Sequence, residues 1–444
     1  MTQPDPRTLA AALWPQQTPS FDRGLPLDRR QTADVVIVGA GYSGLSAALH
    51  LAERGLAVAI IEADRPGGGA SGRNAAGWCP IYFDKSPADV VRLLGTERGG
   101  ALNRMVAESA RLVPALVQKH AMPVDMRQSG IAVVSEAPGS AADQRKLAQG
   151  WNDAGGNVAF LGSDALHAIM DSRRAAHGLL FRDAGTLNPF AYAVGLARAA
   201  VAAGARLFMG DPARRMTETP GGWLVETAHG SVAARHVLIA TEGYEANATL
   251  WPGLERTHYR LPFAMVASAP VPEFAARIMP AGIPLTDTNK GNPFWIMADP
   301  DGRLVASLLP PLGDGATAAQ VAQPLERKLR RLFGDVPAFD WSQFWIGTVA
   351  VSAERIPRLL ALAPRVHAIG GYSGQGIGAA TAAGREYAKL VADDDRAACR
   401  LPVLDPRPLP LRRAVPFLFR NVAAPLGRAT DRSYRAAPKV TVAD

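Results

Sequence analysis

The most constraining feature of the sequence is a glycine-rich turn between two apolar runs near the start of the chain. Residues 35–38 form a continuous apolar run, which is typical of a parallel strand buried on both faces. The run leads into Gly39-Ala40-Gly41-Tyr42-Ser43-Gly44, after which apolar residues recur at helical spacing. A second apolar run, 58–61, ends in Glu62. This order of strand, turn, helix, strand and acidic residue is the context that a dinucleotide-binding unit requires.

Each glycine of this fingerprint, and the acidic residue after it, has a physical role. Gly39 permits the tight turn, Gly41 lets the backbone approach a pyrophosphate, and Gly44 allows close packing of helix on strand. The N-terminus of the helix offers unpaired N–H groups and a positive dipole end to phosphates. The carboxylate of Glu62 can accept hydrogen bonds from both ribose hydroxyls and would repel a 2′-phosphate. These features fit FAD and NAD alike.

The loop after Glu62 helps to choose between the two cofactors. Residues 65–78 are mostly small, and their glycines allow the backbone to pass close to a flat, bulky group. Ser71, Arg73 and Asn74 supply polar contacts for phosphate or flavin edges. The alternative interpretation of this stretch is a flexible surface loop.

Length and composition exclude several classes of protein. The 444 residues suggest two to four folding units, and 48% hydrophobic residues argue against a disordered chain. The net charge of +8 is scattered, without the basic clusters of a nucleic-acid surface, so we expect no nucleic-acid partner. Cys79 and Cys399 are too few for a disulfide scaffold or a zinc site with CxxC spacing, so we predict no metal. We see no secretory signal and no apolar stretch of membrane-spanning length.

The segment VVIVGAGYSGLSAALHLAERGLAVAIIEADRPGGGASGRNAAG resembles the start of the FAD-dependent amino acid oxidase (DAO) superfamily. Its GASGRN part is most similar to the bacterial branch that contains gamma-glutamylputrescine oxidase. The resemblance implies an α/β fold (α+β overall). It further implies a Rossmann-like FAD-binding domain with an inserted mixed antiparallel-sheet substrate domain, and FAD as a non-covalent cofactor.

Two later segments agree with this resemblance. In residues 185–244, Asn188 is a good helix N-cap, and the last predicted strand runs into Thr241, which by resemblance lies beside the cofactor diphosphate. In residues 345–390, a strand feeds a second glycine turn, which by resemblance lies against the flavin. Related chains commonly have a histidine where this chain has Gln375, which leaves a neutral hydrogen-bonding group there.

The fingerprint and the resemblance together give the predicted cofactor contacts. These are Gly39, Gly41, Tyr42, Ser43, Gly44, Glu62, Ala63, Arg65, Gly69, Ala70, Ser71, Arg73, Asn74, Thr241, Gly374, Gln375, Gly376 and Ile377.

The resemblance also implies a division of the chain. We assign residues 30–90, 150–245 and 345–398 to the FAD-binding domain, and residues 91–149 and 246–344 to the substrate domain. The tail, 401–444, is rich in proline and arginine and is partly amphipathic. It can dock on its own domain, on a partner or on a membrane surface, and docking on its own domain is the commoner outcome.

The expected reaction is oxidation of a carbon–nitrogen bond, with hydride passing to flavin N5 and the resulting imine hydrolysed by water. Our tentative catalytic residues are Arg355, which could anchor a carboxylate or reduced flavin, and Gln375. Glu354 could instead attract a cationic amine, and Trp295 is a candidate for the pocket wall. We expect His50 and His120 to be structural and Cys79 to be an unlinked, buried thiol.

The sequence therefore predicts an FAD-dependent amine or amino acid oxidoreductase that passes its electrons to oxygen or a quinone. A gamma-glutamylputrescine-like amine is favoured, ahead of pipecolate, sarcosine or a D-amino acid. One departure weakens this preference, because the branch has a Thr-Glu-Pro-like stretch where this chain reads Ala267-Ser268-Ala269-Pro270. An NAD-dependent dehydrogenase and a non-catalytic flavoprotein are the alternatives. We expect a cytoplasmic protein, with the inner membrane surface as an alternative site for its tail.

Overall fold

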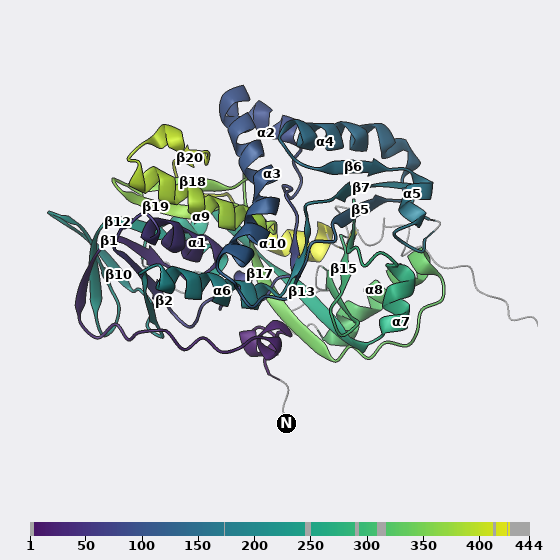
Figure 1. The fold of residues 1–444 in the computed structure, drawn as a ribbon, viewed down its shortest axis with the longest axis horizontal. Helices are drawn as coiled ribbons and strands as arrows, with labels where there is room; N and C mark the ends of the chain where they lie inside the picture. Colours follow the sequence, from purple (N-terminus) through teal and green to yellow (C-terminus); the bar gives the residue numbers. More distant parts are fainter. Residues whose placement is uncertain are drawn as a thin grey trace, which may run out of the picture.

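The computed structural model describes residues 4–172, 174–244, 250–288, 293–308, 317–411, 414–423, 425 and 426. Two large sheets, each with its own helices, lie side by side (Figure 1). Helix α3 (Thr96–Lys119) stands between the two halves in this view.

Among the described residues, nine strands form the first sheet. Its main path runs β20-β18-β19-β12-β1-β2-β9, and β10 and β11 form a hairpin that pairs with β12. The core pairs β19–β12, β12–β1, β1–β2 and β2–β9 are parallel. The strands are β1 (Arg30–Val38), β2 (Val58–Glu62), β9 (Arg206–Met209), β10 (Arg215–Thr219), β11 (Gly222–Glu226), β12 (Ser231–Ile239), β18 (Arg358–Ala363), β19 (Val366–Gly370) and β20 (Val403–Leu404).

The apolar run at the start of the chain forms the centre of this sheet because both of its faces are covered. Val35 and Ile37 are fully buried in the core that includes the helices of this half. Val36 and Val38 point the other way and pack in a second core with Trp223 of the β10–β11 hairpin. A strand covered on both sides has no polar face, which explains why the run is continuous rather than alternating.

Helices α1 (Tyr42–Ala52), α6 (Pro189–Ala202) and α9 (Gly376–Ala392) belong to the first sheet. Asn188 caps α6 by accepting a hydrogen bond from the backbone N–H of Ala191, as the sequence predicts. Helices α1 and α9 cross so closely that a Cβ on Gly384 would lie 2.5 Å from the carbonyl oxygen of Ser43. This close packing holds the two glycine turns, each of which opens one of these helices, next to each other.

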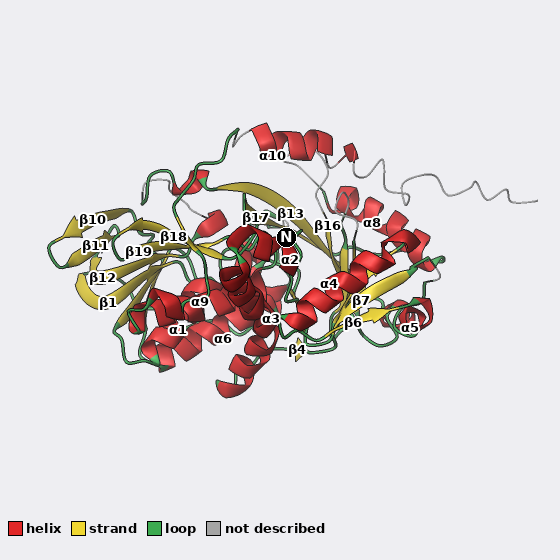
Figure 2. Ribbon diagram, turned by 90° about the horizontal axis from the view of Figure 1, so that it is seen from above, coloured by secondary structure: helices red, strands yellow, loops and turns green. Residues whose placement is uncertain are grey.

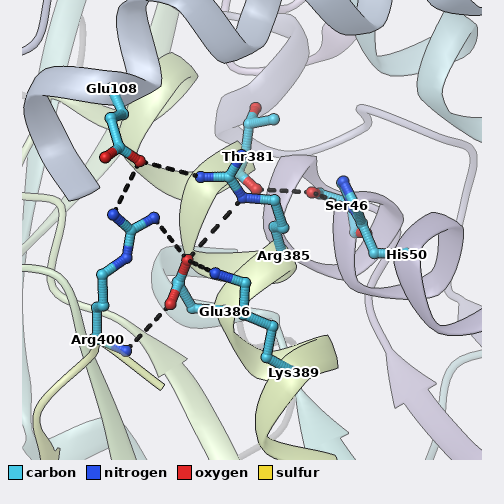
Figure 3. Close-up of polar contacts among 8 residues, drawn as sticks. All are labelled: Ser46, His50, Glu108, Thr381, Arg385, Glu386, Lys389 and Arg400. Carbon is cyan, nitrogen blue, oxygen red and sulfur yellow. Dashed lines mark hydrogen bonds and ion pairs between the residues drawn. The ribbon is translucent and has the colours of Figure 1, made fainter. Parts of the chain in front are cut away.

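A polar cluster ties the far part of α9 to its neighbours (Figure 3). Glu386 is fully buried and forms ion pairs with Lys389 at 2.9 Å and with Arg400 at 2.8 Å. Arg400 also pairs with Glu108 of α3 at 2.8 Å. The cluster therefore connects α3, α9 and the segment that follows α9.

Among the described residues, eight strands form the second sheet, in the order β17-β13-β16-β15-β14-β5-β7-β6. Every neighbouring pair is antiparallel except β14–β5. The strands are β5 (Ile131–Ser135), β6 (Val158–Leu161), β7 (His177–Phe181), β13 (His258–Pro270), β14 (Leu285–Asp287), β15 (Trp295–Ala298), β16 (Arg303–Leu308) and β17 (Gln343–Ser352). Helices α4 (Ala141–Asp153), α5 (Ser163–His167), α7 (Pro272–Ile278) and α8 (Ala318–Phe333) lie in this half (Figure 1).

The remaining elements connect and border the two halves. A small sheet is formed by β3 (Gly77–Trp78), β8 (Gly185–Leu187) and β4 (Met126–Arg127). Helix α2 (Pro87–Leu94) precedes α3, and α10 (Ala414–Leu418) lies along one edge of the molecule in Figure 2. None of the described helices combines the length and the apolar character needed to cross a bilayer.

The predicted architecture of two different sheets is confirmed, but strand pairing divides the chain differently from the sequence-based boundaries. Strands β6 and β7 fall within 150–245, which we assigned to the FAD-binding domain, yet they pair with β5 in the second sheet. Strand β17 begins the segment 345–398 but pairs with β13. Such pairings depend on contacts far apart in the sequence, which local patterns do not contain. We therefore propose sheet membership as the better basis for the division.

Candidate active site

A cavity of about 910 Å³ lies where the first sheet meets the second. On the first-sheet side it is lined by the segments that follow β1, β2, β12 and β19. In an open parallel sheet, ligands bind at the carboxyl ends of the strands, and these four segments all lie there. On the second-sheet side it is lined by side chains of β13, β15, β16 and β17.

The structure brings nearly all of the sequence-predicted cofactor residues to this cavity. Gly44 does not line it, because a Cβ there would lie 2.1 Å from the carbonyl oxygen of Gly39, so its role is packing. Arg65 does not line it either, since its guanidinium pairs with Asp64 and is 59% exposed. The predicted residues that line the cavity are Gly39, Gly41, Tyr42, Ser43, Glu62, Ala63, Gly69, Ala70, Ser71, Arg73, Asn74, Thr241, Gly374, Gln375, Gly376 and Ile377.

The first glycine turn is held in place by the small-residue loop that follows β2. Ser71 Oγ accepts a hydrogen bond from the backbone N–H of Tyr42 at 3.1 Å, at the first residue of α1. The Tyr42 hydroxyl lies 2.6 Å from the carbonyl oxygen of Ser71, which also accepts a bond from Asn74. The loop is therefore an ordered part of the site and not the flexible surface loop of the alternative interpretation.

Glu62 reaches back to the first turn. Its carboxylate accepts hydrogen bonds from the backbone N–H of Ala40 at 2.7 Å and of Asp64 at 3.0 Å. Burial raises the pKa of Glu62, while these backbone bonds act to lower it. The carboxylate at the end of β2 thus lies at the cavity wall with its orientation fixed, as a ribose-binding acid requires.

Arg73 supports the loop rather than projecting into the cavity as a free charge. Its guanidinium donates to the carbonyl oxygens of Arg7 at 2.8 Å and Gly68 at 2.5 Å. It also lies over the ring of Tyr244, 5.1 Å from the ring centre. Arg73 therefore ties together the start of the chain, the loop after β2 and the turn after β12.

The second glycine turn joins the first at the cavity floor. Tyr372 lies in this turn, and its hydroxyl is 2.7 Å from Ser43 Oγ at the start of α1. Gln375 is the N-cap residue of α9 without a side-chain capping bond, and it lines the cavity. The N-termini of α1 and α9, both positive dipole ends, thus face the same cavity.

The wall contributed by the second sheet is largely apolar. Phe263 and Met265 of β13 line it together with Trp295 of β15. The indole of Trp295 packs on the loop after β2, since a Cβ on Gly77 would lie 2.5 Å from its ring. Its buried N–H has no partner among the described residues. The adjoining residue Asn292 lies outside the described part of the chain.

The tentative catalytic residue Arg355 lies behind the wall instead of in it. Its side chain pairs with Asp84, which lines the cavity, and Arg355 itself does not. Glu354 pairs with the buried Arg358. Arg355 therefore holds the segment that contains Asp84 through this ion pair. Glu354 does not line the cavity.

The remaining candidates from the sequence are two histidines and one cysteine. His50 hydrogen-bonds to the carbonyl oxygen of Ser46, and His120 lies 3.4 Å from Glu53; neither lines the cavity. Cys79 does line it, and burial raises the pKa of its thiol. A thiol held protonated is a poor nucleophile, in line with the expected non-covalent cofactor.

Sequence reasoning missed Phe263, Met265, Asp84 and Glu242, all of which line the cavity. Phe263 and Met265 carry no motif, because β13 reaches the site only through pairing with distant strands. Asp84 carries none either, because it lies in the irregular segment between β3 and α2. Glu242 could have been noticed as a charged residue directly after a buried strand of the nucleotide unit.

The cavity fits FAD on three observations. Its volume lies in the upper range of ligand sites. Two helix N-termini and several glycines allow the close approach of an anionic, extended ligand. A Cβ on Gly41 would come within 3.1 Å of Ser71 Oγ, so backbone and not side chain faces the ligand there.

Comparisons with known proteins agree with this geometry. Residues 34–390 match the model of the DAO family, described as FAD dependent oxidoreductase. The probable oxidoreductase OrdL of Rhizobium meliloti is 29% identical over 367 residues, which cover 81% of this chain and 82% of that protein. The gamma-glutamylputrescine oxidoreductase of Escherichia coli is 26% identical over 414 residues, covering 91% and 94%. The crystal structure of glycine oxidase from Geobacillus kaustophilus superposes with a TM-score of 0.68 at 22% identity, covering 83% of this chain and 96% of that one.

Proposed function

The chain belongs to the DAO family of FAD-dependent oxidoreductases, which act on amines or amino acids, and from this membership we propose that it oxidises a gamma-glutamylputrescine-like amine. The support for the substrate is the similarity to gamma-glutamylputrescine oxidoreductase along 91% of the chain. The support for the place of reaction is the cavity, because both glycine turns and the apolar wall of the second sheet meet there.

We propose that separate segments of the first sheet contact separate parts of FAD. The N–H groups at the start of α1, beside Tyr42 and Ser43, hold the cofactor diphosphate, and Glu62 holds the ribose. Residues 374–377, at the start of α9, face the flavin ring and stabilise negative charge on it. When bound, FAD supplies a ring system that accepts a hydride from the carbon next to the substrate nitrogen.

The second sheet supplies the substrate side of the site. Phe263, Met265 and Trp295 present apolar surface that excludes water from the reacting carbon. The unpartnered N–H of Trp295 is available to orient a polar atom of the substrate. The amine must lose its proton before it reacts, and an apolar wall favours the neutral amine.

A substrate panel tests this proposal. The purified holoenzyme would be given gamma-glutamylputrescine, other primary amines, sarcosine, pipecolate and D-amino acids, and kcat/KM compared. We expect gamma-glutamylputrescine or a close analogue to give the highest value. A preference for sarcosine or pipecolate would instead support the alternative of a cyclic or N-methyl amino acid. Parallel assays of oxygen consumption and of quinone reduction would identify the electron acceptor.

We also propose that the tail contacts a membrane surface. Leu411, Phe417, Leu418, Val422 and Leu426 are large apolar residues that are 47–69% exposed. Arginine residues 412, 413, 420 and 428 lie in the same stretch of sequence as these apolar residues. Flotation with anionic vesicles, compared with neutral vesicles, tests this contact, and residues 427–444 lie outside the described part of the tail.

A further inference from the structure

Glu242 is a partly buried acidic residue in the cavity wall for which the mechanism above has no use. It lies in the turn Glu242–Tyr244, directly after β12. Its φ of 37° falls in the left-handed region that residues other than glycine and asparagine seldom adopt. Backbone strain and a buried carboxyl both cost stability, and groups retained in this way gather at functional sites.

The carboxyl of Glu242 connects the ends of two neighbouring strands. Its Oε1 accepts a hydrogen bond of 2.5 Å from the backbone N–H of Gly371, which follows β19. A Cβ on Gly370 would lie 2.5 Å from the same oxygen, so glycine at this position leaves room for the carboxyl. Because β12 and β19 are parallel neighbours, the contact fixes the turn after β12 against the start of the second glycine turn.

Few charges surround Glu242 in the described structure. Arg358 of β18 is the nearest cation in effect, but its side chain is already paired with Glu354 and bonded to the carbonyl oxygen of Thr257. Strand β17, which packs on the turn, carries no charged residue. Other titratable groups that share a cavity wall with Glu242 include His258 of β13, Tyr372 and Tyr244. Charged residues elsewhere along the larger cavity are Glu62, Arg73, Asp84, Lys85, Asp89, Asp143, Lys146 and Asp287.

These neighbours leave Glu242 only partly ionised near neutral pH. Burial raises its pKa to about 7, although the bond from Gly371 and the charge of Arg358 act to lower it. A further negative charge in the same cavity would raise the pKa of Glu242 again, since like charges disfavour ionisation.

We propose that Glu242 is a positioning residue that couples proton uptake to cofactor binding. In its neutral form the carboxyl still accepts the N–H of Gly371 and adds no negative charge that would oppose the anionic diphosphate and the reduced flavin. In its ionised form it repels them. Above the midpoint of its titration, binding of the cofactor therefore takes one proton from solvent onto a carboxylate oxygen of Glu242. The proposal rests on the proposed place of FAD in this cavity.

The test is release of FAD from the purified holoenzyme as a function of pH. Wild type and Glu242→Gln would be diluted into buffers from about pH 6 to about pH 8.5, and free FAD followed by its fluorescence. If the bound cofactor raises the pKa of Glu242 by one unit, the wild-type dissociation constant rises about tenfold across this range. Glu242→Gln keeps the acceptor for Gly371 without the charge, so we expect tight binding at every pH.

Two further variants separate this effect from a merely structural role. Glu242→Ala removes the acceptor, so it should loosen FAD at every pH without a titration. Glu218→Gln makes the same change at an exposed position of β10 and should leave the wild-type profile intact. Equal pH profiles for wild type and Glu242→Gln would overturn the proposal. A wild-type protein that takes up no FAD at any pH would overturn the proposed function itself, and this inference with it.

Discussion

The two sheets contribute to the cavity in opposite ways. The first sheet contributes backbone, through turns that follow parallel strands, with glycines where a side chain would intrude. The second sheet contributes side chains such as Phe263 and Trp295, on strands that pair across long sequence distances. A site built from backbone needs glycines at the positions of close approach, and these are visible in the local sequence. A wall built from side chains on distant strands requires no such local pattern. Substitutions in the first sheet should therefore affect folding and cofactor together, and those in the second sheet should separate the two.

Gly44→Ala should give the largest effect. The new Cβ would lie 2.1 Å from the carbonyl oxygen of Gly39, and neither backbone can move without separating α1 from β1. We expect a loss of about 3 kcal/mol or more in the free energy of unfolding, with loss of bound FAD. Gly221→Ala is the matched control, because a Cβ there meets no atom within 4 Å and Gly221 does not line the cavity. Equal melting temperatures for the two variants would refute the close packing assigned to Gly44.

Asp287→Asn tests the second sheet. Asp287 of β14 forms an ion pair of 2.5 Å with Lys328 of α8, whose side chain is 2% exposed. Breaking an ion pair of a buried ammonium by removal of the carboxylate typically costs about 3 kcal/mol. Below the melting temperature, we expect the FAD content of the variant to equal that of the wild type, because the second sheet is not expected to hold the cofactor. Asp171→Asn breaks an exposed pair with Arg277 and should change chemical denaturation by less than about 1 kcal/mol.

Glu386→Gln tests the polar cluster of Figure 3 through its pH dependence. Burial acts to raise the pKa of Glu386, but bonds from Arg400 and Lys389 outweigh it, so the pKa is lowered. A carboxyl with a lowered pKa stabilises the folded state above its unfolded value and loses this contribution as pH falls through the folded value. Near neutral pH, we expect the free energy of unfolding of the wild type to exceed that of the variant by about 2 kcal/mol.

This advantage should shrink on acidification below about pH 4.5, the range in which the unfolded carboxyl becomes protonated. Urea denaturation at several pH values measures it. A difference that is constant with pH would show that the carboxylate charge does not stabilise the cluster. Glu108→Gln is the control, since its side chain is 41% exposed and should contribute less.

Of these variants, Trp295→Phe should have the smallest effect. It should separate a loss of catalytic efficiency from any loss of FAD most clearly. Because the indole N–H bonds to no described group, its loss should not itself lower stability, and the smaller ring should lower the melting temperature only slightly. The variant loses apolar contact with substrate and one donor, so we expect kcat/KM to fall by about tenfold or less. FAD content should stay at the wild-type level. A variant that loses FAD instead would place Trp295 in the cofactor site.

The same contrast explains what the sequence could and could not predict. The first turn, Glu62, the capped helix α6 and the second turn are visible in the sequence because each depends on neighbours within a few residues. Arg65 and Arg73 are equivalent in the sequence pattern, but only Arg73 lines the cavity, and that depends on the path of the loop. Glu242 was missed because the fingerprint contains no acid at that point. The apolar wall was missed because β13 and β15 become neighbours of the cavity only through sheet pairing.

The central claim is that the cavity between the two sheets oxidises an amine with bound FAD. The most direct measurement is the visible spectrum of the purified holoenzyme, recorded without oxygen while gamma-glutamylputrescine and other amines are added one by one. We predict an oxidised-flavin spectrum that bleaches with at least one amine of the panel. A flavin spectrum that no amine or amino acid bleaches would contradict it.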